Sequence, residues 1–397
     1  MTPLAITKFS LVNGLGAGCA ASADALKTRR SALTPCAFET VTLPTFTGEL
    51  AALESRAVAA SLAAYDCRNN RLAEWGLESD DFAGAVDFAR RKYGANRIGV
   101  FVGTSTSGIL QTELAYRRRA ASDGALPPDF HYAETQNTFS LGDFVQRTLA
   151  LTGPAFVVSS ACSSSAKVFG NAARMITAGI CDAAVVGGVD TLCLTTLYGF
   201  HSLGLLSSSP CRPFDAERDG ISLGEGAGFA LLERCSGQTY RGATLLLGIG
   251  ESCDAYHMST PHPDGAGARL AMLRALASAG ISPSAIDYVN AHGTASRTND
   301  VSEDKAIVDV FGAATPVSST KGSTGHLLGA AGITEAIISM LAMQNDFLPG
   351  SLNTRTRDPA LRSNYLLDNR AAKPRRILSN SFGFGGNNCS LVLARKD

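Results

Sequence analysis

Short apolar runs alternate along the chain with longer segments in which apolar residues recur at three- and four-residue spacing. The short runs predict strands over residues 97–102, 155–160, 183–188, 226–232, 244–250, 286–290, 317–320, 377–380 and 389–394. The amphipathic segments predict helices over residues 163–178, 266–279, 300–311 and 334–344. Strands that alternate with helices are typical of an α/β protein with mixed sheets covered on both faces.

Two glycine-rich turns each lead directly into an apolar strand, at residues 224–232 (GEGAGFALL) and 383–393 (GFGGNNCSLVL). Each would close one half of the chain, so we expect a duplicated fold in one compact body, with halves at residues 1–240 and 241–397. The alternative is that such turn–strand units are common in any α/β protein. Residues 38–87 are rich in alanine and predict only helices and loops.

Composition excludes several classes of function. The 35 basic residues balance the 35 acidic ones, so no net field would gather nucleic acid or an anionic membrane. Charged residues make up 18% of the 397, below the usual ~25%, which favours an oligomer whose apolar surface is covered.

The ten cysteines contain no C-x-x-C pair, which argues against a metal site and a disulfide framework. No apolar run is long enough to cross a membrane, and the first residues do not resemble a secretion signal. We therefore expect a cytoplasmic protein with reduced thiols.

Cys162 is the strongest candidate for chemistry. In GPAFVVSSACSSSAKVFGNAARMI, residues 153–176, an apolar strand stops at small residues and a helix begins at once. A thiol at the start of a helix lies beside unpaired N–H groups, which lower its pKa and can hold an oxyanion. The alternative is a small buried cysteine, the ordinary state of this residue.

Two histidines follow predicted strands in loops of small residues: His292 in VNAHGTAS and His326 in STKGSTGHLLGAAG, with Lys321 five residues before His326. One cysteine and one histidine could form a hydrolase-like pair. A cysteine, two histidines and a lysine favour carbon–carbon bond formation on thioesters, because two imidazoles can hold an enolate beside an acyl-cysteine.

The chain resembles the β-ketoacyl-acyl carrier protein synthases of the elongating kind, in the thiolase-fold superfamily. The motifs that carry this resemblance are SSACSSSA (159–166), VVGGVD (185–190), RPFDAERDGISLGEGAG (212–228), ESCDAYHMSTP (251–261), YVNAHGT (288–294), SSTKGSTGHLLGAAG (318–332) and NSFGFGGNN (380–388). The resemblance implies a duplicated five-layered α-β-α-β-α fold. The cysteine would lie in the first half, and both histidines and the lysine in the second.

The resemblance also implies roles for these residues. Cys162 would take the acyl chain from acyl carrier protein, with the N–H groups of Cys162 and Phe384 as the oxyanion hole. His292 and His326 would then bind the malonyl thioester and support its decarboxylation, so that the enolate attacks the acyl group to give a 3-oxoacyl carrier protein and CO₂. Lys321 would pair with Glu303 and balance the charge of the site.

Further positions match the family's binding residues. Thr294 and Ser296 would contact the phosphopantetheine arm, and Thr106, in the acyl-pocket loop GTSTSGI, would contact substrate. Phe384 would be the gating phenylalanine, opposite a second gating loop at residues 254–258. Asn290 and Glu335 match a buried polar pair where a structural monovalent cation is sometimes bound. No other cofactor is expected, since phosphopantetheine arrives on the carrier protein.

The first hundred residues match the family poorly. The segment that usually carries basic residues for carrier docking reads ALESRAVAASLAAYDCRNN, with Arg56 and Arg68 as its main cations. Both primary fatty acid elongation and a specialised polyene or polyketide pathway remain open. The partner chain could be a second copy or a different ketosynthase-like chain. The alternatives are a non-catalytic chain-length-factor-like subunit, which normally lacks the cysteine, and a thiolase, for which Cys389 would have to be reactive.

Overall fold

The computed structural model describes residues 1–235 and 243–396. The strands of the first half are β1 (Leu4–Asn13), β5 (Ile98–Gly103), β6 (Ala155–Val158), β7 (Ala183–Asp190) and β9 (Gly226–Arg234). Those of the second half are β10 (Thr244–Cys253), β11 (Tyr288–Asn290), β12 (Pro316–Ser318), β16 (Arg376–Gly383) and β17 (Asn387–Arg395). The boundary expected at residue 240 lies outside the described residues.

The helices are α1 (Cys19–Lys27), α2 (Arg68–Glu78), α3 (Phe82–Tyr93), α4 (Ile109–Arg117), α5 (Tyr132–Thr135), α6 (Phe139–Thr148), α7 (Ser164–Thr177), α8 (Leu194–Ser202), α9 (Ala266–Ala279), α10 (Arg297–Phe311), α11 (Lys321–Thr324) and α12 (Ala331–Gln344). Short strands complete the structure: β2 (Gly16–Ala17), β3 (Thr34–Pro35), β4 (Phe46–Gly48), β8 (Leu223–Gly224), β13 (Phe347–Leu348), β14 (Asn364–Tyr365) and β15 (Arg370–Ala371).

Sheet topology shows the internal repeat directly. The main sheet runs β14-β12-β11-β16-β17-β10-β1-β9-β7-β5-β6. Numbered within its own half, each set of five strands therefore has the order 1-5-4-2-3. The strand directions also agree, because β7–β9 and β16–β17 pair antiparallel, whereas β5–β7 and β11–β16 pair parallel. The halves join where Leu4–Ile6 of β1 pair with Thr244–Leu246 of β10.

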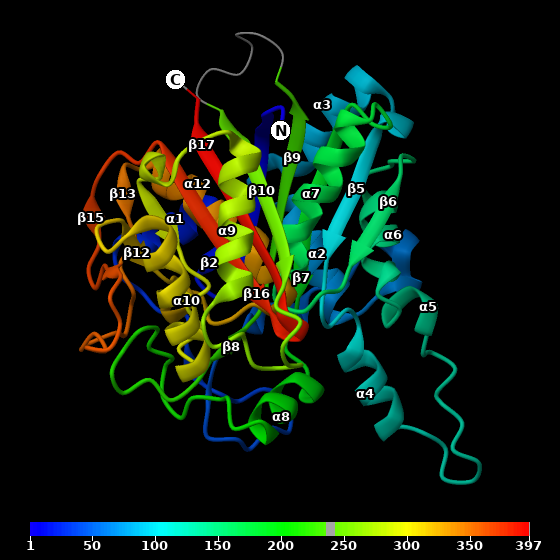
Figure 1. Ribbon diagram of the computed structural model, residues 1–397. Helices are drawn as coiled ribbons and strands as arrows, with labels where there is room; N and C mark the ends of the chain where they lie inside the picture. The colour runs from blue at the N-terminus through cyan, green and yellow to red at the C-terminus, as the bar shows by residue number, and fades with distance from the viewer. Residues whose placement is uncertain (236–242, 397) are drawn as a thin grey trace.

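Three apolar clusters define five layers (Figure 1). Strand residues alternate between them, as the two-residue period of a strand requires: Val100 and Val102 face α2, α3 and α6, whereas Phe101 faces the interior. The interior cluster contains α7 and α12, and the third cluster packs α9 and α10 on the second half. The order is therefore helix, sheet, helix, sheet, helix.

The predicted elements match these bounds within a few residues, but the first hundred residues contain structure that the pattern missed. β1 is a central strand with a mostly buried sequence. Within residues 38–87, predicted to hold helices and loops, α2 and α3 form and the three-residue strand β4 pairs with β8.

No helix within residues 1–235 and 243–396 is both long enough and apolar enough to cross a membrane.

Candidate active site

Cys162 lies in the turn between β6 and α7, as the sequence predicts. Ala161, just before it, has a positive φ of 51°, which turns the chain sharply from strand to helix. The Ala161 carbonyl accepts hydrogen bonds from the Ser164 side chain at 2.6 Å and from the Ser105 side chain at 3.2 Å. The small residues around Cys162 therefore hold a strained turn that presents the thiol at the end of the sheet.

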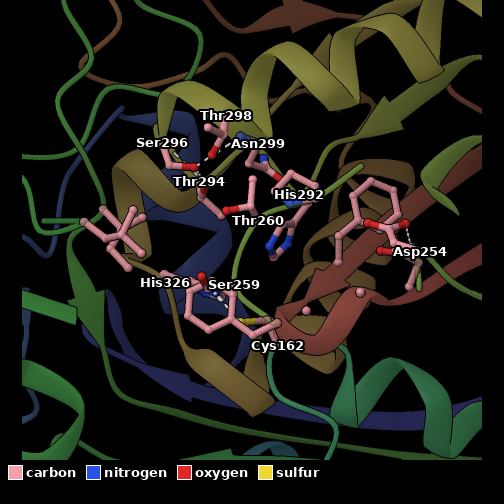
Figure 2. A pocket seen from close by; sticks show the side chains of 18 of the residues that line it. Cys162, Asp254, Ser259, Thr260, His292, Thr294, Ser296, Thr298, Asn299 and His326 are labelled. Carbon is pink, nitrogen blue, oxygen red and sulfur yellow. Dashed lines mark hydrogen bonds between the residues drawn. The ribbon is translucent and has the colours of Figure 1, made fainter. Parts of the chain in front are cut away.

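A cavity opens from this thiol toward the surface and, with its mouth, encloses about 610 Å³. Figure 2 shows Cys162, His292 and His326 at its inner end and the hydroxyls of Thr294, Ser296 and Thr298 on one wall. Apolar side chains also line the cavity, namely Phe200, Leu205, Ile221, Phe382 and Phe384, together with the polar Asp254, Ser259, Thr260, Asn299 and Asn388. A cavity lined by both hydroxyls and apolar side chains suits an amide-containing arm that carries a thioester.

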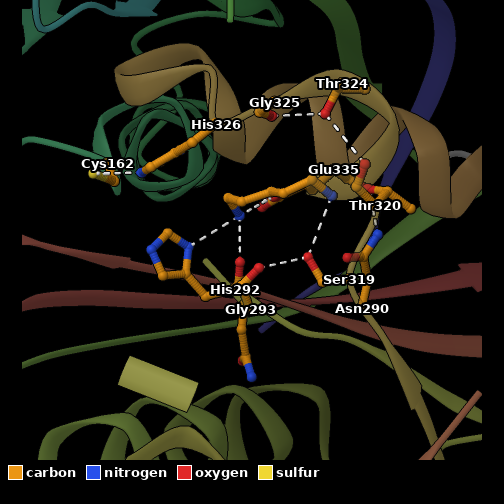
Figure 3. A network of polar contacts seen from close by, with 12 residues as sticks. Cys162, Asn290, His292, Gly293, Ser319, Thr320, Thr324, Gly325, His326 and Glu335 are labelled. Carbon is orange, nitrogen blue, oxygen red and sulfur yellow. Dashed lines mark hydrogen bonds and ion pairs between the residues drawn. The ribbon is translucent and has the colours of Figure 1, made fainter. Parts of the chain in front are cut away.

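The two predicted histidines meet Cys162 from the second half of the chain (Figure 3). His326 lies between α11 and α12, and its Nε2 is 3.0 Å from the Cys162 Sγ. His292 follows β11, and its ring centroid is 5.3 Å from that of His326, nearly perpendicular. The repeat explains the meeting, because α7 and α12 follow equivalent strands and pack together in the middle layer.

Lys321 is buried beside His292, but its predicted partner was wrong. The ammonium forms an ion pair with Glu335, not with Glu303, and donates to the carbonyl oxygen of His292. It also lies 3.3 Å from His292 Nδ1. An ammonium can only donate, so this contact makes Nδ1 the acceptor and leaves the Nε2 proton free to face the cavity.

Glu303 instead holds the loop that carries His292. Its carboxylate accepts from the backbone N–H groups of His292 at 2.8 Å and Gly293 at 2.7 Å, and from the Asn380 amide at 3.2 Å. Burial raises the pKa of Glu303 to about 7, and these donors act in the opposite direction. Its role is to orient the backbone rather than to balance the lysine.

Both imidazoles are neutral at pH 7. Burial, together with the Lys321 ammonium, holds the pKa of His292 and the pKa of His326 well below the ordinary value. A neutral imidazole can donate one N–H to a carbonyl oxygen without carrying a charge that the cavity would have to solvate.

The thiol pKa differs from the sequence expectation. Burial raises the pKa of Cys162 to about 12, and the Lys321 ammonium and the Phe384 N–H only partly offset it. The predicted lowering by the helix terminus was therefore wrong for this closed site, because desolvation outweighs it. At rest Cys162 is a thiol, and His326 is placed to take its proton during attack.

This raised pKa predicts how Cys162 reacts with iodoacetamide. Its alkylation rate should rise about tenfold per pH unit between pH 7 and 9, since the thiolate fraction rises in that proportion. Cys253, which is exposed, serves as the internal reference. Peptide mass spectrometry measures both rates, and a Cys162 rate that is already flat above pH 7 would contradict the prediction.

The oxyanion hole expected from the N–H groups of Cys162 and Phe384 stays a prediction, and the structure places Phe384 beside the thiol. The Phe384 N–H is directed at Cys162, and Gly383 allows the approach: a Cβ there would lie 2.9 Å from the Ser160 oxygen and 3.1 Å from the Cys162 nitrogen. The Phe384 ring packs against Phe200 with centroids 5.4 Å apart. The loop after Phe384 contacts the second predicted gating loop, where Gly385 donates to the Met258 carbonyl.

Comparison with known proteins agrees with this geometry. Residues 83–237 match "Beta-ketoacyl synthase, N-terminal domain" and residues 243–355 match "Beta-ketoacyl synthase, C-terminal domain". The chain is 37% identical to 3-oxoacyl-[acyl-carrier-protein] synthase 2 of Vibrio cholerae, over 76% of each protein. The chain belongs to the β-ketoacyl synthase family.

Two further relatives extend the comparison. The chain is 43% identical to a mitochondrial 3-oxoacyl-[acyl-carrier-protein] synthase of Arabidopsis thaliana over 61% of its length, and spans 56% of that protein. It superposes with a TM-score of 0.90 and 37% identity on a chain from a structure of a ketosynthase with its chain length factor from Xenorhabdus doucetiae, covering 99% and 98% of the two chains. The predicted thiolase-like fold is confirmed.

Thr294 and Ser296 of this β-ketoacyl synthase lie where predicted. Both line the cavity, and their hydroxyls are 3.0 Å apart. Thr106 does not lie where predicted, because it is not among the described residues that line the cavity. Its hydroxyl instead donates to the buried Asp190 carboxylate at 2.8 Å. The predicted substrate contact is therefore replaced by an internal one.

Sequence reasoning missed several residues of the site. Asp190 lies beneath the turn of Cys162, and Phe200 packs on the gating phenylalanine. Asp254, named only as the start of a loop, accepts from the Asn388 amide at 2.8 Å and so ties the two gating loops together. The motif VVGGVD ends on Asp190, and a carboxylate at the end of a buried strand was the available signal.

Proposed function

We propose that the protein is a β-ketoacyl-acyl carrier protein synthase that condenses a malonyl thioester with an acyl group carried on Cys162. The observation that carries the proposal is the convergence of Cys162 and two neutral imidazoles in one buried cavity, with Cys162 Sγ 3.0 Å from His326 Nε2. Neither a hydrolase nor a simple thioesterase needs the second imidazole and the buried lysine.

The first half-reaction forms the acyl-enzyme. The Cys162 sulfur attacks the thioester carbonyl of the acyl carrier arm while His326 accepts its proton. The developing oxyanion lies between the N–H groups of Cys162 and Phe384. The carbon–sulfur bond to the arm then breaks, and the arm leaves as a thiol with that proton.

The second half-reaction forms the carbon–carbon bond. The malonyl carboxylate leaves as CO₂, and its bonding electrons pass into an enolate whose oxygen accepts the Nε2–H of His292. His326, whose Nε2 accepted the thiol proton in the first half-reaction, contributes a second Nε2–H once its remaining proton has moved from the unpartnered Nδ1 to Nε2. The enolate carbon attacks the Cys162 thioester, and the carbon–sulfur bond breaks to release the 3-oxoacyl product. The departing thiolate takes up a proton from water, which restores the resting thiol, so each turnover consumes one proton. Lys321 orients His292 throughout through its contact with Nδ1.

A partner chain is part of the proposal. β6 is the last strand of the main sheet, and Phe156 on it is 43% exposed. We propose that another chain covers this sheet edge and its exposed aromatic side chain. The similar chain from Xenorhabdus doucetiae comes from a structure of a ketosynthase in complex with its chain length factor, so we favour a different ketosynthase-like chain, and a specialised pathway, over a second copy.

The carrier protein is the second partner. Docking of the carrier protein on the segment around residues 50–70 is unsupported, because the two arginines of this segment already form ion pairs within the chain. Arg56 forms an ion pair with Glu78 and stacks on Trp75, and Arg68 is buried against Glu225. We therefore propose that the carrier docks without that segment.

The residues around Asn290 fit the monovalent cation that the family sometimes holds. Within the described part of the chain, Asn290 Oδ1, Glu335 Oε2 and Ser379 Oγ are buried oxygens without a hydrogen-bond partner. Asn290 and Ser379 are paired in register on β11 and β16, and the Asn290 amide faces the Glu335 carbonyl. We propose that these three side chains would hold the cation, whose charge would stabilise the carboxylate that pairs with Lys321.

Intact mass spectrometry tests the proposal. We expect the protein to gain the mass of one acyl group, on Cys162, when it is incubated with acyl carrier proteins loaded with saturated or unsaturated chains. Transfer from many saturated chains would indicate fatty acid elongation. Transfer from one carrier only, or only with a ketosynthase-like partner chain present, would indicate a specialised pathway. No transfer under any condition would overturn the proposal in favour of a structural subunit.

A further inference from the structure

Asp190 is a completely buried carboxylate that no step of the proposed reaction uses. It ends β7 and accepts hydrogen bonds from three residues of one loop: the Thr104 hydroxyl at 2.7 Å, the Ser105 N–H at 2.8 Å, and the N–H and hydroxyl of Thr106 at 2.9 and 2.8 Å. It also accepts from the N–H of Gly329, which is far away in the sequence. Such a concentration of donors on one carboxylate makes its position rigid.

One branch of this network reaches the nucleophile. Ser105, whose N–H is bound by Asp190, uses its hydroxyl to donate to the Ala161 carbonyl at 3.2 Å. Ala161 is the positive-φ residue that turns the chain immediately before Cys162. The carboxylate therefore acts on the turn of Cys162 through a single intervening residue.

The other branch reaches the catalytic histidine. Gly329 follows His326 by three residues, and Leu328 between them has a positive φ of 49°. The Gly329 backbone packs closely against Asp190 and Ser105, because a Cβ at this position would lie 2.7 Å from both Asp190 Oδ2 and the Ser105 hydroxyl. The same carboxylate thus binds one loop from each half of the repeat.

We infer that Asp190 is a positioning residue, which sets the distance between Cys162 Sγ and His326 Nε2 by holding both of their loops. This inference rests on the proposed function, since the 3.0 Å contact is the one through which His326 accepts the thiol proton. Positioning errors of about 1 Å at a reacting pair can cost roughly a hundredfold in rate.

Asp190 also contributes a charge. The groups that face Cys162 are the cation of Lys321, the carboxylates of Asp190 and Glu335 and the two neutral imidazoles. Burial raises the pKa of Asp190, the hydrogen bonds from Thr104, Ser105 and Thr106 act in the opposite direction, and in its charged form Asp190 opposes formation of the thiolate. Replacing Asp190 with asparagine should therefore make the thiolate more accessible while loosening the loops, since an amide NH₂ would face N–H donors.

The test compares two pairs of variants of the full chain. Asp190→Asn is matched by Asp304→Asn, because Asp304 is another buried carboxylate that binds backbone N–H groups, of Arg362 and Ser363. Ser105→Ala is matched by Ser107→Ala, which loses contacts to residues 135 and 137 instead. The measurements are the acyl-transfer rate at saturating carrier, the iodoacetamide alkylation rate of Cys162 at pH 8 and the melting temperature.

We expect Asp190→Asn and Ser105→Ala to slow acyl transfer by roughly tenfold to a hundredfold, with both control variants within about twofold of the unmodified protein. Cys162 alkylation should rise in Asp190→Asn and stay unchanged in Ser105→Ala, which keeps the charge. The inference is overturned if Asp190→Asn and Asp304→Asn lose transfer equally at equal folded fraction, or if Asp190→Asn transfers normally. Because alkylation needs no carrier protein, its Asp190 response can be read even if the proposed function fails.

Discussion

Cys162→Ala is expected to abolish acyl transfer completely, with no acyl mass adduct and a loss of condensation of at least about a thousandfold. The covalent intermediate needs this sulfur, and removal of a nucleophile typically costs far more than any binding residue. Decarboxylation of the malonyl thioester should persist, because His292 and His326 keep their places. Intact mass and release of CO₂ measure the two half-reactions separately.

The matched control is Cys181→Ala, which also removes a buried thiol but lies at the far end of β7 from the site. It should lose some stability and keep acyl transfer. An acyl adduct that survives in Cys162→Ala would place the nucleophile elsewhere. Loss of CO₂ release in that variant would show that the imidazoles cannot act without the sulfur.

The layers and the site residues could be predicted because each depends on a short stretch of sequence. The strand–turn–helix at Cys162 and the strand–loop contexts of His292 and His326 are local, and the internal repeat brings them together. β1 was missed because its sequence, LAITKFSLVN, mixes apolar and polar residues, and its place between β9 and β10 depends on pairing with segments more than two hundred residues away.

Errors concentrated on pairwise contacts between distant residues. Lys321 could reach either Glu303 or Glu335, and only the packing of α12 in the middle layer decides for Glu335. Thr106 was expected to contact substrate because its loop does so in the family, but its hydroxyl donates a hydrogen bond to the Asp190 carboxylate instead. The thiol pKa was misjudged because local helix geometry is visible in sequence, whereas the desolvation that raises it is a property of the whole fold.

The cytoplasmic location remains a prediction from the sequence.

Lys321→Met should lose condensation by roughly a hundredfold or more, the size of effect that a positioned proton-transfer group typically supplies. The ammonium contributes to holding the pKa of His292 low and fixes its Nδ1 as an acceptor. Without it the pKa of His292 should rise toward its ordinary value, so the imidazole becomes cationic at a higher pH. The acid limb of the condensation profile should therefore move to higher pH.

A double variant separates this role from stability. Breaking a buried ion pair typically costs about 3–5 kcal/mol, but less is expected here because Glu335, whose pKa burial raises to about 7, can take up a proton. Lys321→Met combined with Glu335→Gln removes both charges and should recover melting temperature without recovering condensation. The exposed pair of Lys305 and Asp264 provides the control Lys305→Met, expected to be silent. If the double variant regained condensation, Lys321 would serve only to neutralise Glu335, and the orientation of His292 would have to come from Glu303 and the backbone of its loop alone.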